Sequence, residues 1–422
     1  MEILKRRFDL VGPATALVVL VAGTLSATSA DWPQWRGPNR DGISTETGLL
    51  KKWSDGGPPL AWKTTGLGAG HSTVAISKGR IFTTGDRSDS SFVIALNEAD
   101  GKEVWSTKLG KPGAPGWGGF AGPRATPTID GQRLYTVDQW GEMVCLDAAD
   151  GKEVWRKDYI KDFGSSRPEW GFSESPLVDG DQVIVTPGGE KGAMAALKKD
   201  TGAVIWRSTE FTDGAHYSSV NIATIGGVKQ YVQLTSENVV GIAPKDGKVL
   251  WKAKRKGATA VIPDPIVCDS MVYVTSGYGA GCNLFNVTSS GGSFSTTQVY
   301  ANKVMVNHVG GVVLVKDAVY GFSDGKGWTC QDLKTGEAKW QEKGQIGKGS
   351  ILFADGCLYL RHEEKKGTIA LIEASVDGWK ELGRFDQPER TDKNSWAPPV
   401  VANGKLYIRD QDLLLCYDVK AK

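Results

Sequence analysis

The chain carries the sequence ADGKEVW at residues 99–105 and repeats it at residues 149–155. Weaker copies end on Trp206, Trp251 and Trp340. The first four tryptophans of this series are 50, 51 and 45 residues apart, and the next gap of 89 residues is about two periods. A fixed period of this length is typical of repeat architectures, in which each unit packs against its neighbours.

Each period has the same internal order of apolar runs and turns. In the second period an apolar run at 126–129 leads into an Asp-Gly turn, and further runs follow at 133–137 and 142–147 before the one that ends on Trp155. Alternating apolar residues, β-branched residues and Asp-Gly turns predict four short antiparallel strands. Four strands in about 45 residues are typical of one blade of a β-propeller.

The periods predict an all-β protein, an eight-bladed β-propeller of four-stranded antiparallel blades. Seven blades run roughly over residues 71–109, 124–160, 173–211, 216–256, 262–303, 306–343 and 349–387, and the eighth begins near Trp396. The eighth period stops at residues 417–418, so the N-terminal strand around Trp62 should complete the last blade and close the ring. Tyr300 is expected in the tryptophan position of the fifth period, which is divergent. If that stretch did not fold as a blade, the ring would have seven blades.

The repeated tryptophans have a structural explanation. A flat indole can pack over the turn of the adjacent blade and donate its N–H to a backbone carbonyl there. The glycine four residues before each tryptophan lets that turn approach closely. We therefore expect docking roles for Trp62, Trp105, Trp155, Trp206, Trp251 and Trp340.

The repeat takes the form Asp-x-x-Thr-Gly-x-x-x-Trp, as at residues 332–340. This pattern resembles the quinoprotein (PQQ-type) propeller repeat and extends over nearly all of the chain after residue 30. The segment DWPQWRGPNRDG at residues 31–42 is similar to the opening segment of exported PQQ-like propeller proteins. The resemblance implies a propeller fold but two kinds of function. Such propellers include PQQ-dependent alcohol dehydrogenases and the BamB type of outer-membrane assembly factor, which is a non-enzymatic scaffold.

Residues 1–30 have the features of a signal peptide. A basic stretch at residues 5–7 precedes an apolar run at 10–25, and residues 27–30 end in a small-x-small cleavage pattern. An uncleaved anchor is the alternative, but the run is shorter than the roughly 18–20 residues that a membrane span prefers. We expect export to the periplasm or the extracellular space, no integral membrane segment after cleavage, and one PQQ-like propeller domain over residues 31–422.

The net charge limits the classes of binding partner, and the cysteine content limits the number of disulfides. The formal net charge is only +2 and no basic stripe is present, so no nucleic acid is expected as a partner. A protein partner or a small-molecule or glycan ligand, bound by a monomer, fits this composition. Six cysteines in an exported chain permit disulfides, but several occupy equivalent repeat positions, as small buried strand residues do. We expect at most one disulfide, with Cys268 and Cys282 the nearest pair in sequence.

Candidate binding residues are those in loops that enter the innermost strand of each blade. These loops line one mouth of a propeller channel, where ligands usually bind. The loops at 111–120 and 167–172 are rich in glycine, proline and aromatic residues, and they either bind a ligand or plug the channel. The candidates are His71, Trp117, Arg124, Trp170, His216, Tyr217, His308 and Trp396.

Catalytic candidates are weaker. Glu174 and Asp264 start inner strands and could act as general bases or cation ligands, although carboxylates at such positions more often accept hydrogen bonds from backbone amides. His71, His216 and His308 come from three different blades, so satisfied polar roles are favoured over a shared metal and no metal site is assigned.

The resemblance also sets the requirements of a quinoprotein enzyme. PQQ is a planar, tri-anionic quinone that needs a flat stacking partner, a cation such as Ca²⁺ held by oxygen ligands, and a carboxylate base. PQQ alcohol dehydrogenases commonly cover the cofactor with a disulfide between adjacent cysteines, and some carry a C-x-x-C-H haem motif. This chain has neither an adjacent cysteine pair nor that motif.

The sequence therefore favours an exported binding scaffold that holds a ligand or partner at its channel mouth. The alternative is a PQQ- and calcium-dependent alcohol or sugar dehydrogenase with Glu174 or Asp264 as the base. A second alternative is a BamB-like assembly factor, against which the missing lipid-attachment cysteine at the cleavage site counts. Enzymatic activity is left open.

Overall fold

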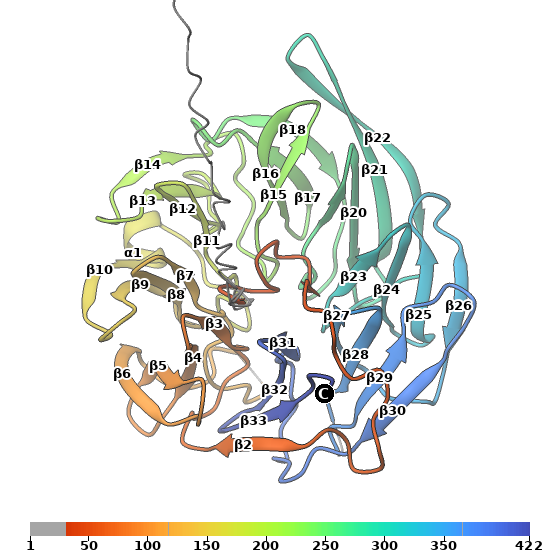
Figure 1. Ribbon diagram of the computed structural model, residues 1–422. Coiled ribbons are helices and arrows are strands. Elements are labelled where there is room, and N and C mark those ends of the chain that lie inside the picture. The colour runs from red at the N-terminus through yellow and green to blue at the C-terminus, as the bar shows by residue number, and fades with distance from the viewer. Residues whose placement is uncertain (1–30, 117, 365) are drawn as a thin grey trace, which may run out of the picture.

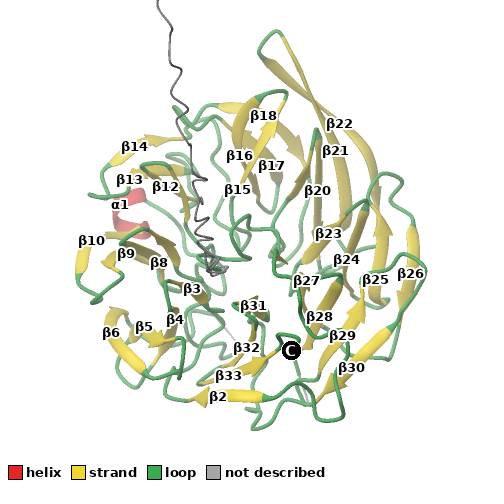
Figure 2. Ribbon diagram, viewed as in Figure 1, coloured by secondary structure: helices red, strands yellow, loops and turns green. Residues whose placement is uncertain are grey.

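The chain forms a ring of eight β-sheets around a central channel (Figures 1 and 2). This description rests on a computed structural model that describes residues 31–116, 118–364 and 366–422. Each sheet has four antiparallel strands, which follow the sequence from the channel outward in seven sheets. In the eighth sheet the outermost strand comes from the N-terminal side, and one of the other sheets carries an additional inner strand. The eight-bladed, all-β prediction is confirmed, and the seven-bladed alternative is wrong. Residues 1–30, the predicted signal peptide, lie outside the described residues.

The strands of each blade follow the predicted periods closely. Blades one to four consist of β3 (Ala75–Ser77), β4 (Arg80–Asp86), β5 (Ser91–Asn97), β6 (Glu103–Gly110); β7 (Thr128–Asp130), β8 (Arg133–Val137), β9 (Glu142–Asp147), β10 (Glu153–Asp158); β11 (Leu177–Asp179), β12 (Gln182–Val185), β13 (Ala195–Lys198), β14 (Val204–Arg207); and β15 (Asn221–Ile225), β16 (Val228–Leu234), β17 (Asn238–Ile242), β18 (Val249–Lys254). Blades five to eight consist of β19 (Ile266–Cys268), β20 (Met271–Ser276), β21 (Gly281–Ser290), β22 (Ser293–Asn302); β23 (Val312–Val315), β24 (Ala318–Ser323), β25 (Gly327–Asp332), β26 (Ala338–Glu342); β27 (Gly349–Ala354), β28 (Cys357–His362), β29 (Ile369–Glu373), β30 (Glu381–Phe385); and β31 (Val400–Ala402), β32 (Lys405–Asp410), β33 (Leu413–Asp418), β2 (Leu60–Thr64). The short helix α1 (Tyr159–Phe163) follows β10, and no helix in the described part of the chain is long and apolar enough to cross a membrane.

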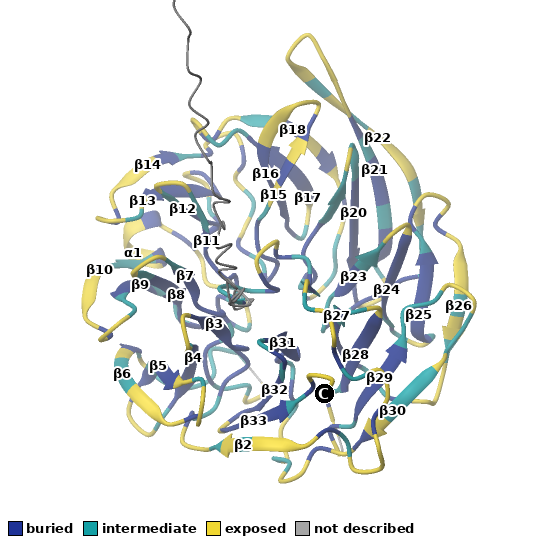
Figure 3. Cartoon of the chain, in the orientation of Figure 1, coloured by how far each residue is buried: buried dark blue, intermediate teal, exposed yellow. Residues whose placement is uncertain are grey.

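The N-terminal strand closes the ring, as predicted. β2 pairs antiparallel with β33, and Trp62 lies opposite Cys416 in this register. The two ends of the repeat array therefore share the eighth sheet, which leaves no strand edge open at the seam. The core lies between neighbouring blades, where the inner and middle strands are buried, whereas the outermost strands are largely exposed (Figure 3).

Docking indoles connect neighbouring blades. Five of the six predicted tryptophans donate their Nε1–H to a backbone carbonyl of the next blade over 2.8–3.3 Å: Trp62 to Glu98, Trp105 to Ala148, Trp155 to Lys199, Trp206 to Pro244 and Trp340 to Ser375. In the fifth blade, the Tyr300 hydroxyl donates to the Leu333 carbonyl in the same way, at 2.8 Å. Gly151 shows why the turn beneath needs glycine, because its φ is 75° and a Cβ there would lie 2.5 Å from the Trp105 ring.

Trp251 departs from this pattern. Its Nε1–H donates to the side-chain oxygen of Gln230, within its own blade, rather than to a carbonyl of the next blade. In the fifth blade the turn that would receive the indole is at the tip of the long hairpin of β21 and β22, which projects from the ring (Figure 1). The prediction that the Trp251 indole donates to a carbonyl of the next blade is therefore wrong. The indole is nonetheless buried in one hydrophobic cluster with Phe285 and Val287 of that blade.

The cysteines are all unpaired. The one disulfide that the sequence allowed, between Cys268 and Cys282, does not form, and the other four are also free thiols. Three of them lie directly opposite docking indoles: Cys145 faces Trp155, Cys330 faces Trp340 and Cys416 faces Trp62. A small, buried side chain leaves room for the large ring on the neighbouring strand, which explains their equivalent positions.

Residues 31–44, here called the N-terminal strap, run through the channel and contact the inner edges of several blades (Figure 1). Trp32 exchanges two backbone hydrogen bonds with Ile76 in the first blade. The strap ends in β1 (Ile43–Ser44), which pairs parallel with β27 and adds a fifth strand to the seventh blade. The strap therefore fills part of the channel and provides a floor on which the candidate site is built.

Candidate functional site

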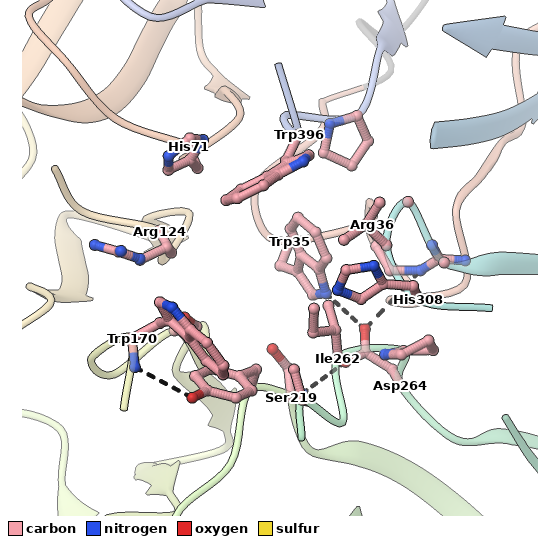
Figure 4. Close-up of a pocket in the computed structure, with 18 of the residues that line it drawn as sticks. Trp35, Arg36, His71, Arg124, Trp170, Ser219, Ile262, Asp264, His308 and Trp396 are labelled. Carbon is pink, nitrogen blue, oxygen red and sulfur yellow. Dashed lines mark hydrogen bonds and ion pairs between the residues drawn. The ribbon is translucent and has the colours of Figure 1, made fainter. Parts of the chain in front are cut away.

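A cavity of about 320 Å³ opens at the channel mouth above the strap (Figure 4). Seven residues predicted from their positions before inner strands line it together: His71, Arg124, Trp170, Tyr217, Asp264, His308 and Trp396. They come from blades one, two, three, four, five, six and eight in turn, because the loop before each inner strand points into the same mouth. Residues at equivalent positions in different repeats therefore lie close together in the fold, although they are far apart in the chain.

Three other candidates are placed differently. His216 is adjacent to Tyr217 but does not line the cavity, and its Nδ1 accepts a hydrogen bond from the Val261 amide at 3.1 Å. Glu174 is buried beside the strap and is absent from the cavity wall. Trp117 lies outside the described residues.

The cavity also contains residues that sequence reasoning missed. Trp35 and Arg36 come from the strap, and Tyr278 comes from the turn between β20 and β21. Phe120 belongs to the aromatic-rich loop that the sequence indicated, and its ring centroid lies 4.8 Å from that of Trp396. The strap was recognisable from its DWPQWRG sequence, but no repeat signal places it inside the channel.

Local backbone geometry fixes the strap residues. Arg36 and Arg40 both have positive φ, 59° and 58°, and the Gly42 amide donates to the Arg36 carbonyl at 2.9 Å. This tight turn sends the two guanidinium groups in different directions. Arg36 donates to the Val312 carbonyl in the sixth blade, whereas Arg40 donates to the Ser175 carbonyl near the third, at 2.8 Å.

Asp264 is held by three groups at the base of the cavity. One carboxylate oxygen accepts from the Ser219 amide at 2.6 Å and the other from the Trp35 indole at 2.6 Å, while Arg36 Nε lies 4.0 Å away (Figure 4). Burial raises the pKa of this carboxyl above its ordinary value, and the guanidinium groups of Arg36 and Arg40 oppose the shift. Both oxygens are thus engaged within the protein.

Glu174 is similarly occupied. Its carboxylate accepts from both the amide and the hydroxyl of Thr186, the latter at 2.9 Å. Burial raises the pKa of Glu174 to about 7, against the effect of the Thr186 bonds and of Arg40. This matches the ordinary structural role of a carboxylate at a strand start, in which it accepts from backbone amides.

The two cavity histidines are kept neutral by their surroundings. Burial, with Arg124 and Arg409 nearby, holds the pKa of His71 well below its ordinary value. Burial and Lys348 lower the pKa of His308 to about 4, and Lys348 Nζ lies 2.6 Å from the His308 Nδ1. Among the described residues, no three His, Cys, Asp or Glu side chains are grouped as metal ligands.

The residues present fit only part of a PQQ and calcium site. The aromatic walls and Arg124 suit a flat anion. Ca²⁺, however, takes six to eight oxygen ligands. Asp264 is the one carboxylate among the described cavity residues, and its two oxygens already accept hydrogen bonds. The described donor set does not fit calcium, and we derive no chemical step through a quinone.

The fold and this channel-mouth cavity define a propeller of the quinoprotein type. A family model described as "Outer membrane protein assembly factor BamB" matches residues 89–342, and the chain belongs to this family of PQQ-like repeat proteins.

Proteins with similar sequences include both assembly factors and an alcohol dehydrogenase. A protein of Yersinia pestis named outer membrane protein assembly factor BamB is 24% identical over 339 residues, which cover 75% of this chain and 78% of that protein. A protein of the same name from Burkholderia pseudomallei is 22% identical over 191 residues, 44% of this chain and 45% of its own length. The quinohemoprotein alcohol dehydrogenase ADH IIB of Pseudomonas putida is 34% identical over 101 residues, 24% of this chain and 14% of that enzyme.

Solved structures show the same fold. BamB from Moraxella catarrhalis is similar with a TM-score of 0.59 at 16% identity, over 83% of this chain and 95% of that one. The quinohemoprotein alcohol dehydrogenase from Comamonas testosteroni is similar with a TM-score of 0.64 at 12% identity, over 93% of this chain and 81% of the enzyme. A BamB protein and an alcohol dehydrogenase thus share the ring, so the fold does not separate their functions.

Proposed function

We propose that this protein is an exported binding scaffold that holds a ligand or a partner's side chain in the channel-mouth cavity and catalyses no reaction there. The observation that carries the proposal is the engagement of both candidate bases. Asp264 is bonded through both oxygens, and Glu174 is bonded to Thr186 away from the cavity wall. A general base must reach the substrate proton directly or through one water. Glu174 does not line the cavity, and Asp264 lines it with both oxygens already accepting hydrogen bonds from the protein.

The other features of the mouth support binding. The cavity walls are mainly aromatic and apolar, with few polar groups, as is usual for small-molecule sites. The strap stabilises these walls, because Trp35 donates a hydrogen bond to Asp264 and Arg36 forms an ion pair with it. Export through residues 1–30 and a single domain over residues 31–422 belong to this proposal.

A titration of the purified protein with PQQ, with and without Ca²⁺, tests the absence of quinone catalysis. We expect no Ca²⁺-dependent, saturable rise in melting temperature and no dye reduction when an alcohol is added. A Ca²⁺-dependent rise together with dye reduction that is lost in Asp264→Asn would overturn the proposal and establish the dehydrogenase alternative.

A second candidate function is a BamB-like role in outer-membrane protein assembly, which the match to the Yersinia pestis protein over 75% of this chain favours. In this role the protein would bind other proteins of the assembly machinery. Affinity purification from the native envelope tests it, with mass spectrometry of the retained proteins. Recovery of outer-membrane assembly proteins with the wild type is expected if the role holds, and their absence after cross-linking would rule it out.

A further inference from the structure

The charges around the cavity are not fully balanced. Arg36 lies 4.0 Å from Asp264, and Lys348 forms an ion pair with Asp324 at 3.0 Å. Arg124 instead donates to two carbonyl oxygens of its own loop, and within the described part of the chain no carboxylate oxygen lies within 4.0 Å of its guanidinium. Carbonyl groups solvate a guanidinium but do not neutralise it. Arg124 is therefore a cation of the cavity without an ion pair among the described residues, on which the Asp86 carboxylate acts only from beyond 4.0 Å, and Figure 4 shows it below His71.

The uncharged polar groups of the cavity mostly have a hydrogen-bond donor to offer to a ligand. Because Lys348 is a donor only, the His308 Nδ1 beside it accepts, and the proton of the neutral ring is on Nε2. The Tyr217 hydroxyl accepts from the Trp170 amide at 3.3 Å, which leaves its own hydrogen for another acceptor. A ligand that supplies acceptor oxygens fits this set better than a sugar, which also needs acceptors from the protein.

His71 adds a second observation at the same side of the cavity. Its side chain is 92% buried, and its Nδ1 has no hydrogen-bond partner among the described residues. The ring lies against Trp396 with centroids 4.5 Å apart and the two planes tilted by 32°. A buried polar atom without a partner costs free energy, and the His71 residue also lines the cavity.

The walls select a flat and compact molecule. Trp35, Trp170, Trp396 and Phe120 present aromatic faces from four different loops. The cavity volume of about 320 Å³ is at the lower end of ligand sites, which usually hold about 300–1,000 Å³. A ligand with one aromatic ring system and one short acidic group satisfies these limits of shape and volume. It also matches the one described cavity guanidinium that has no ion pair.

We propose that the cavity binds a small aromatic monocarboxylate, with the ring between the tryptophan faces and the carboxylate toward Arg124 and His71. This inference rests on the proposed binding function and names the class of ligand. A monoanion matches the one guanidinium among the described cavity residues that has no ion pair, whereas a polyanion would leave carboxylates buried without partners.

Fluorescence and calorimetric titrations with phenylacetate and its neutral analogue phenylacetamide test the inference. The two probes have nearly the same shape and differ in charge, so their affinity ratio isolates the ionic contribution. We expect phenylacetate to quench tryptophan fluorescence and to bind at least tenfold more tightly than phenylacetamide, with an advantage that shrinks as salt is added.

Two arginine variants assign the charge. Arg124→Gln should remove most of the tenfold preference, and Arg124→Lys should keep part of it. Arg207→Gln is the matched control, because Arg207 also donates to two loop carbonyls and has no carboxylate partner within 4.0 Å in the described residues, yet it does not line the cavity. If Arg124→Gln unfolds the loop, His71→Gln provides an independent variant that should weaken phenylacetate binding alone.

The outcomes separate this inference from the proposed function. Equal affinities for phenylacetate and phenylacetamide, or no binding of either, would overturn the monocarboxylate inference. The proposed non-catalytic function is decided by the PQQ and Ca²⁺ titration, whose result does not depend on either probe. Tight phenylacetate binding that survives Arg124→Gln and His71→Gln unchanged would also contradict the inference, because the anion would then lie elsewhere.

Discussion

Single side chains show how one repeated residue can have different partners. Trp340 and Trp251 occupy the same repeat position, but Trp340 donates to a carbonyl of the next blade while Trp251 donates to Gln230 in its own. The repeat pattern predicts that an indole will be buried at this position. It does not predict the acceptor, because the acceptor belongs to a turn whose geometry depends on the following blade.

Glu174 provides a prediction at the residue scale. Its folded-state pKa is raised from 4.5 to about 7, so the folded protein holds a proton there that the unfolded chain releases. Its contribution to the free energy of unfolding is therefore present below pH 4.5 and is lost as the pH rises toward 7. Arg40 and Asp264 are the charged groups that face it, and the positive one limits the shift.

Glu174→Gln should remove this pH dependence. Between pH 5 and pH 8 the free energy of unfolding of the wild type should fall by about 2.5 kcal/mol more than that of the variant. Urea denaturation at both pH values measures the difference. Glu190→Gln, at an exposed position, is the control and should follow the wild type. A Glu174→Gln variant with the wild-type pH dependence would show that the carboxyl titrates normally.

At the scale of elements, the N-terminal strap explains which part of the site the sequence could not predict. Loops before inner strands converge by repetition, so His71, Asp264 and Trp396 were found from their positions alone. Trp35 and Arg36 reach the cavity through contacts with blades five and six, more than two hundred residues later in the chain. The strap is not part of the repeat, so the period of the sequence does not predict which blades it contacts.

Two glycine substitutions test whether the strap is seated as described. Gly37 has φ of 86°, and a Cβ there would lie 2.7 Å from the Trp32 ring, whereas Gly48 has φ of 72° and open space around it. Both alanine variants should lose roughly 1–2 kcal/mol for the left-handed backbone. Gly37→Ala should lose a further 1–3 kcal/mol or so from the clash with Trp32. Equal losses in thermal denaturation would show that the Trp32 ring does not cover Gly37, and the described conformation of the strap would be wrong.

The whole molecule depends on the pairing of its two ends. The number of blades and the closing strand were predictable, because eight periods and one surplus tryptophan strand imply a ring with a shared last blade. The unpaired cysteines were also consistent with their repeat positions. Cys268 and Cys282, the pair that the sequence allowed, are not bonded, because proximity in sequence does not place two thiols opposite each other across strands.

An engineered disulfide can measure this closure. Trp62→Cys places a thiol opposite Cys416 across the seam, and Trp155→Cys places one opposite Cys145 inside a single blade. Both variants lose one docking indole, so they are matched. Oxidation should stabilise Trp62→Cys by about 3 kcal/mol more than Trp155→Cys, because the cross-link closes a far longer loop. A mobility shift on non-reducing gels reports the bond, and its absence in Trp62→Cys alone would contradict the closed ring.

The position of the strap also has a consequence for the order of assembly during synthesis. Residues 31–44 leave the ribosome before every blade that they touch, and their partners in β27, Phe353 and Ala354, are made more than three hundred residues later. The strap must wait, unpaired, while the blades are formed around its eventual path. Its seating is therefore a late event that only a nearly complete ring allows, and the cavity floor is finished at the same moment as the ring itself.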